Sequence, residues 1–77
     1  MKRPYLPNMK AAIAISFGKR VRDERARKGL SQEQLAELAH VHRTYIGMVE
    51  RGEKNITLGN IAKIAKALKL PVSELLS

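Results

Sequence analysis

The fold of this 77-residue chain is decided by residues 30–52, LSQEQLAELAHVHRTYIGMVERG. Ser31 followed three residues later by Gln34 is typical of a capping box, which predicts that a helix starts at Ser31. A tight turn over residues 40–42 separates this helix from a second short helix, predicted over residues 43–51. Two short helices joined by such a turn form a unit in which the first supports the second.

Three further helices are predicted outside this unit. Ser16 is a candidate N-cap for a first helix that runs to about residue 28, where Gly29 ends it. Thr57 is a candidate N-cap for a fourth helix, and Pro71 suits the first turn of a short fifth helix. We therefore expect an all-α, compact five-helix domain around one aliphatic core. The predicted inward-facing positions are Leu35, Leu38 and Ala39, then Ile46 and Val49, then Leu58, Ile61, Ile64, Ala65 and Leu68.

The chain divides into residues 1–15, a basic arm or a helix extension, and residues 16–77, the five-helix domain. Pro4 and Pro7 predict an irregular start. Residues 9–15 alternate like a strand, but we favour helix because the chain offers no second strand to pair with. The basic and apolar start resembles a signal peptide, an interpretation that we reject because the prolines interrupt the apolar stretch.

Composition narrows the class of protein. The absence of cysteine excludes disulfides and thiolate metal sites and is compatible with the cytoplasm, where we expect the protein to act. No apolar run approaches the roughly 20 residues of a membrane span. The net charge is +8, and residues 1–29 contain nine Lys or Arg and two acids, whereas residues 30–77 contain six and five. The first third of the chain therefore carries most of the attraction to a polyanion.

The second helix of the unit is expected to present a polar face outward. Its inward positions leave His42, Arg43, Thr44, Gly47 and Met48 on that face. Arginine donates two hydrogen bonds to guanine, and threonine or methionine contacts a thymine methyl group, so these residue types suit the reading of base edges in a major groove. An ordinary polar helix surface is the alternative, which we disfavour because the core pattern and the spacing agree along the segment.

The strings LSQEQLAELA and HRTYIGMVERGEKNITL resemble the lambda-repressor-like, Xre-type helix-turn-helix transcriptional regulators. The resemblance covers residues 16–76, and the HRTYIG segment is most similar to controller proteins of restriction–modification systems. It implies sequence-specific binding of double-stranded DNA by a homodimer on a (pseudo)palindromic operator, and regulation of transcription, here of a restriction–modification operon. It also implies that the fourth and fifth helices form the dimer contact.

The resemblance implies roles for particular residues. Arg43 and Thr44 match positions that read bases, and the outward-facing Met48 is a third candidate. Arg25 and Glu50 match a partly buried ion pair between the first and third helices. The resemblance places phosphate contacts at Gln32, Tyr45, Arg51 and Lys54, and a protonated His42 is a further candidate.

The C-terminal apolar residues and the residue in the turn leave alternatives open. Val72, Leu75 and Leu76 are candidate dimer contacts because apolar residues left over at a surface usually mark an interface, although they could also complete the monomer core. His40 stands in the turn where the family usually has glycine. That position often needs a positive φ, which histidine tolerates better than most residues.

Other functions are disfavoured. His40 and His42 lack a third nearby ligand, so we expect no metal and no cofactor. Glu33 and Glu37 are expected to face water, and Thr44 has no base partner, so we expect no enzyme. With no second domain, no small-molecule effector is expected. The alternative function is a protein–protein adaptor or antitoxin-like subunit with the same fold.

Overall fold

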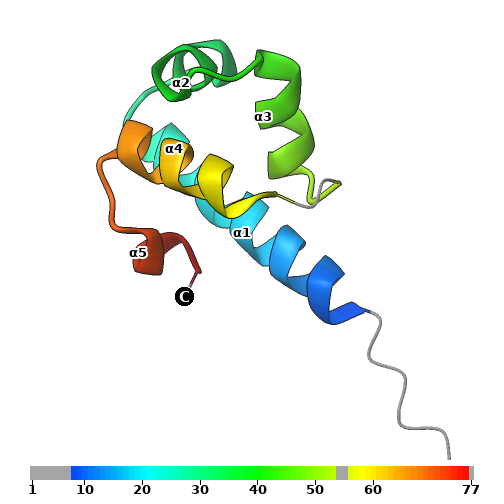
Figure 1. The fold of residues 1–77 in the computed structure, drawn as a ribbon. Helices are drawn as coiled ribbons and strands as arrows, with labels where there is room; N and C mark the ends of the chain where they lie inside the picture. The colour runs from blue at the N-terminus through cyan, green and yellow to red at the C-terminus, as the bar shows by residue number, and fades with distance from the viewer. Residues whose placement is uncertain (1–7, 54–55, 77) are drawn as a thin grey trace, which may run out of the picture.

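Five α-helices follow one another in the computed structural model, which describes residues 8–53 and 56–76 (Figure 1). The described residues contain no strand, and the all-α, five-helix expectation is confirmed. In chain order the helices are α1 (Asn8–Arg27), α2 (Gln32–Ala39), α3 (Arg43–Glu50), α4 (Leu58–Leu68) and α5 (Val72–Leu76).

Side-chain hydrogen bonds start α2 and α4 at the predicted residues. The Ser31 hydroxyl accepts a bond from the Gln34 amide at 2.9 Å, and the Gln34 carboxamide oxygen accepts one from the Ser31 amide at 2.8 Å. The Thr57 hydroxyl accepts a bond from the Asn60 amide at 3.1 Å. Each bond satisfies an N–H group that a helix start leaves without an intrahelical partner. Both predicted N-caps are confirmed.

Two helices end on residues in the left-handed conformation. His40 after α2 and Lys69 after α4 both have φ of 58°. Their backbone N–H groups donate back to carbonyls of the last turn, Ala36 and Glu37 for His40. The positive φ expected at His40 is therefore present, and a side chain in this conformation costs roughly 1–2 kcal/mol.

Helix α1 begins earlier than the sequence predicted. It starts at Asn8, so Ser16 lies inside the helix and is not its N-cap. Residues 8–15 continue α1 past the other helices, as Figure 1 shows. Ile13 and Ile15 on this extension are 57% and 48% exposed. Of the arm or helix extension predicted for residues 1–15, residues 1–7 lie outside the described residues.

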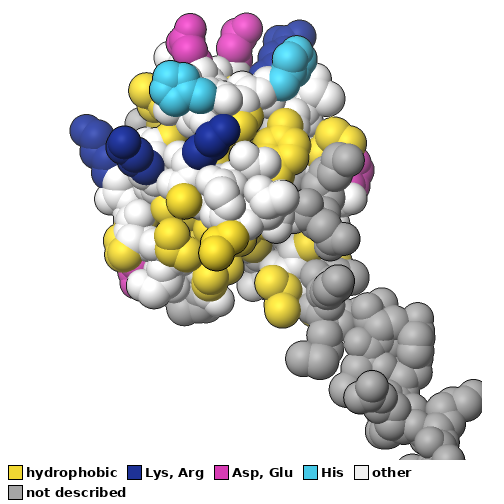
Figure 2. Space-filling view, viewed as in Figure 1, with side chains coloured by type: hydrophobic (Ala, Val, Ile, Leu, Met, Phe, Trp, Pro, Cys, Tyr) yellow, Lys and Arg dark blue, Asp and Glu magenta, His cyan; other side chains and the backbone are white. Residues whose placement is uncertain are grey.

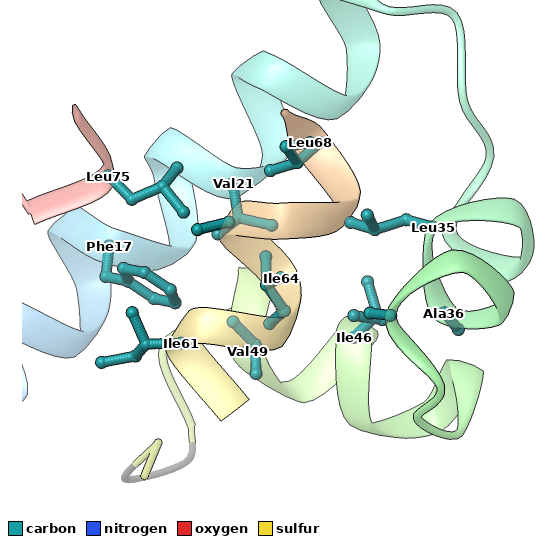
Figure 3. Packing of buried hydrophobic residues seen from close by; sticks show 12 residues of the cluster. Phe17, Val21, Leu35, Ala36, Ile46, Val49, Ile61, Ile64, Leu68 and Leu75 are labelled. Atoms are coloured by element: carbon teal, nitrogen blue, oxygen red, sulfur yellow. The ribbon is translucent and has the colours of Figure 1, made fainter. Parts of the chain in front are cut away.

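All five helices contribute to one hydrophobic core (Figure 3). Leu75 of α5 lies beside Phe17 and Val21 of α1 and is 1% exposed. Leu75 therefore completes the monomer core, and its prediction as a dimer contact is wrong. The buried core residues are Phe17, Val21, Leu35, Ala36, Ala39, Ile46, Val49, Ile61, Ile64, Ala65, Leu68 and Leu75.

Two predicted core residues lie outside the core. Leu38 is 54% exposed because α2 turns the face formed by Leu35, Ala36 and Ala39 inward instead. Leu58 is 74% exposed because it is the first residue of α4, one turn before the buried Ile61. The prediction that both residues lie in helices is confirmed, but the prediction that they face the core is wrong.

A close helix crossing positions α3 on α1. A Cβ atom at Gly18 would lie 2.2 Å from the Val49 carbonyl oxygen and 2.9 Å from that of Glu50. Real Cβ atoms do not approach backbone so closely, so only glycine allows α1 to pass the end of α3 at this distance. The crossing fixes where α3 sits on the domain surface.

Candidate nucleic-acid interface

Helix α3 is attached to the core on one side and exposed on the other. Ile46 and Val49 are buried, whereas Arg43 and Thr44 are exposed at the helix start. The turn before α3 is fixed by a bond from the Val41 amide to the Ala36 carbonyl at 3.0 Å. A short helix held in this way presents its first turn outward, as a helix that enters a major groove must do.

His42 starts α3 by accepting a hydrogen bond. Its Nδ1 atom accepts from the Thr44 amide at 3.1 Å, which makes His42 the N-cap of α3. The sequence analysis missed this role because histidine is not among the common N-cap residues. Protonation at Nδ1 would turn the acceptor into a donor and remove the cap, so only Nε2 remains to contact phosphate. That phosphate contact stays a prediction.

A groove of about 560 Å³ runs between the starts of α2 and α3. It brings together four residues predicted to contact DNA, namely Gln32, Arg43, Thr44 and Arg51. Three predicted contacts, His42, Tyr45 and Met48, do not line it. The lining residues are Arg25, Ser31, Gln32, Glu33, Arg43, Thr44, Gly47 and Arg51.

The groove rests on a network centred on Glu50. Arg25 Nε donates to Glu50 Oε2 at 2.6 Å, and Arg25 Nη2 donates to Oε1 at 3.1 Å. The Glu50 side chain is 4% exposed, and the hydrogen bond to it raises the pKa of Arg25 above its ordinary value. Gln32 Nε2 donates to the same Oε1 atom at 3.0 Å. Glu50 at the end of α3 is therefore bonded both to Arg25 near the end of α1 and directly to Gln32 at the start of α2.

The network also contains a link that was not predicted. The sequence analysis paired Arg25 with Glu50 but treated Gln32 only as a phosphate contact. Here one of the two hydrogens on Gln32 Nε2 is bonded to Glu50, which leaves the other for an outside acceptor. Residues 18 positions apart give no local sequence signal for such a bond.

Arg51 forms a second ion pair at the other end of the groove. Its Nε donates to Glu53 Oε2 at 2.7 Å, and its Nη2 donates to Oε1 at 3.2 Å. The two bonds raise the pKa of Arg51 and lower the pKa of Glu53. Both side chains remain at least half exposed, at 58% and 50%.

The four remaining predicted positions are Gly47, Tyr45, Met48 and Lys54. Gly47 is buried, because Arg51 Nη1 and Gln32 Oε1 would lie 3.3 and 3.7 Å from its Cβ. Gly47 lies on the groove-lining side of α3, but these two side chains cover it. The Tyr45 hydroxyl accepts a bond from the Asn60 carboxamide of α4 at 3.1 Å and is half-buried. Met48 is half-buried, and Lys54 lies outside the described residues.

The surface around the α2–α3 turn is polar. Figure 2 shows both histidines there with acidic and basic side chains, whereas hydrophobic side chains gather on the lower part of this face.

Within residues 8–53 and 56–76, His, Asp and Glu side chains form no group of three that could hold a metal ion. No helix in the described part of the chain is long and apolar enough to cross a membrane.

Comparison with known proteins identifies the family. The helix-turn-helix family model matches residues 21–75. The chain belongs to the Xre-type helix-turn-helix family. The resemblance stated from the sequence is thereby confirmed, and the family consists of transcriptional regulators rather than enzymes.

Restriction–modification controllers are among the similar members of this helix-turn-helix family. Control protein C.SmaI of Serratia marcescens is 54% identical over 57 residues, which cover 74% of this chain and 68% of the relative. The controller protein C.AhdI of Aeromonas hydrophila is 50% identical with a TM-score of 0.81, covering 83% and 97% of the two chains. SinR, described as the master regulator for biofilm formation and solved in complex with DNA, is 32% identical with a TM-score of 0.76, covering 79% and 98%.

Proposed function

We propose that this chain is a sequence-specific, double-stranded-DNA-binding transcriptional regulator that acts as a homodimer in the cytoplasm. The observation that carries this proposal is the groove in which Gln32, Arg43, Thr44 and Arg51 meet. Its similarity to C.SmaI and C.AhdI supports a role as controller of a restriction–modification operon. No enzymatic step, cofactor or small-molecule effector is part of the proposal.

Helix α3 enters the major groove with its first turn. Arg43 donates to the O6 and N7 atoms of a guanine, and Thr44 contacts a neighbouring base edge. The partly buried Met48, one turn further on, adds an apolar contact at the margin of this surface. Base discrimination therefore rests mainly on Arg43, the long exposed side chain in the first turn of α3.

Phosphate contacts set the register of α3 on the duplex. Gln32 offers its second Nε2 hydrogen while the first stays bonded to Glu50, so its carboxamide meets the phosphate already oriented. Arg51, Lys54, Tyr45 and the Nε2 atom of His42 complete the set. The basic first third of the chain adds attraction that is independent of sequence and falls with salt.

A second copy of the chain packs against the outer side of α5. An apolar cleft of about 170 Å³ lies between α1 and α5, and Leu76, which is 49% exposed, is in its lining. Val72 is half-buried next to this surface, and Ile13 on the α1 extension is exposed at its other side. A two-fold contact here places the two α3 helices on half-sites about one turn, roughly 34 Å, apart or a multiple of that distance.

Selection of bound sequences from random DNA tests the proposal. We expect enrichment of a two-fold symmetric site that binds tightly and in a salt-sensitive manner. Arg43→Ala costs about 1–3 kcal/mol on that site and relaxes preference at one base pair per half-site. Lys66→Ala removes the same charge from the last turn of α4 and should leave the preference intact. Absence of any enriched sequence would favour the adaptor or antitoxin-like alternative.

A further inference from the structure

Glu53 is held in place by its own backbone as well as by its side chain. Gly52 adopts a left-handed φ of 73°, and the chain then turns back so that the Glu53 amide donates to the Met48 carbonyl at 2.9 Å. A Cβ atom at Gly52 would lie 2.8 Å from the Ile15 side chain, so this turn packs directly on α1. The Glu53 carboxylate is therefore anchored relative to α3.

The anchored carboxylate occupies one edge of the Arg51 guanidinium. Its bonds to Nε and Nη2 use two of the five N–H donors and leave three, two of which lie parallel on the Nη1–Nη2 edge. Nη1 lies 3.3 Å from the position of a Cβ at Gly47, on the groove-lining side of α3. The edge with two parallel donors, which suits a bidentate contact, is thus the one left toward the groove.

We propose that Glu53 is a specificity-determining residue that acts by positioning Arg51. Its carboxylate holds the guanidinium in one orientation, so that Arg51 meets the operator with the Nη1–Nη2 edge. The Arg51 side chain therefore loses less conformational entropy when it binds. On other DNA, where the contacts of α3 do not fit, a guanidinium held in this orientation is less well placed to contact phosphate. This inference rests on the proposed function, because it concerns the ratio of operator to non-operator affinity.

The test is Glu53→Gln, measured against the selected operator and a scrambled duplex at one fixed salt concentration. We expect the ratio of the two affinities to fall roughly two- to fivefold, the range available from one exposed ion pair. Loss of a negative charge alone would strengthen both affinities by the same factor and leave the ratio unchanged. Asp23→Asn, an equal charge change at an exposed position of α1, is the control and should leave the ratio unchanged.

A double-mutant cycle separates positioning from charge. In an Arg51→Ala background, Glu53→Gln should no longer alter the affinity ratio, because the group that Glu53 positions is gone. Glu53→Asp keeps the charge but shortens the side chain, and it should lower the ratio as Glu53→Gln does. Thermal melting verifies that every variant is folded. We expect all of them to fold, because the Arg51 and Glu53 side chains are both at least half exposed.

The outcomes distinguish a failure of the role of Glu53 from a failure of the proposed function. An unchanged ratio in Glu53→Gln, or an equal change with and without Arg51, overturns the role of Glu53 while the proposed function stands. A wild-type chain with no preference between the two duplexes overturns the proposed function, and it does so before any variant is made.

Discussion

The substitution Gly18→Ala tests the helix crossing that positions α3 on α1. The added Cβ would lie 2.2 Å from the carbonyl oxygen of Val49 and 2.9 Å from that of Glu50. Neither atom belongs to a flexible side chain that could rotate away. The variant must therefore move α1 away from the end of α3, or bend one of the two helices.

The magnitude follows from two opposing contributions. Overpacking of a dense core typically costs about 1–3 kcal/mol, and contact with rigid backbone at Gly18 places this case at the upper end. Replacement of glycine by alanine inside a helix returns up to about 1 kcal/mol. The net expectation is a loss of about 2 kcal/mol, which lowers the melting temperature of a domain of this size by roughly 8–16 °C.

Thermal and urea unfolding followed by circular dichroism measure this loss. Gly59→Ala is the matched control, because the nearest atom to its Cβ is the Thr57 hydroxyl oxygen at 3.9 Å. The control should be as stable as wild type or slightly more stable. If Gly18→Ala unfolds within about 0.5 kcal/mol of wild type, the crossing is not as close as described and the reasoning fails.

Two further predictions concern α5 and the Arg51–Glu53 pair. Leu75→Ala should lower the free energy of unfolding by about 2–5 kcal/mol, because it empties a core position. Leu76→Ala should leave stability within about 0.5 kcal/mol and instead weaken the dimer in sedimentation experiments, and equal effects of the two would contradict the assignment. NMR titration should find the pKa of Glu53 below its usual range, moving upward in Arg51→Ala, because the guanidinium favours the charged carboxylate. The stability from this pair is present above the usual carboxyl pKa and is lost as pH falls through the lowered one; a Glu53 pKa that Arg51→Ala leaves unchanged would show that the pair does not form in solution.

The sequence predicted those parts of the fold that local chemistry determines. Ser31 and Thr57 start helices with bonds to amides three residues away, so their roles can be read from short strings. The start of α1 could not be read in this way, because Ser16 has the right chemistry for a cap but lies within a helix that begins at Asn8. A residue that suits a helix start does not require one.

Burial was harder to predict than helix type. Leu38, Leu58 and Leu75 are the same residue type, yet Leu38 and Leu58 are exposed whereas Leu75 is buried. The difference depends on which neighbours each helix meets, and α5 buries Leu75 only because it folds back onto α1. Likewise Gly18 has no local signal, because its contact partners are about 30 residues away in the sequence.

In the candidate site, the sequence identified the residue types that meet in the groove but not how they are held. Arg43 and Thr44 followed from the outward face of a short helix. The bond between Gln32 and Glu50 and the pairing of Arg51 with Glu53 depend on the placement of helix ends, which a pattern of apolar residues does not determine. The role of His42 as N-cap of α3 was missed because histidine is not among the common N-cap residues.

The left-handed residues His40 and Lys69 imply that this chain keeps a stability reserve outside the groove between α2 and α3. Glycine at either position would remove the steric cost of a side chain at positive φ. Its larger loss of backbone entropy on folding offsets most of this gain, so the net stabilisation is a fraction of about 1 kcal/mol. Most substitutions that alter base recognition destabilise a small domain, and a domain near its stability threshold tolerates few of them. These two helix ends are therefore places where compensating substitutions could accumulate while α3 acquires a new operator.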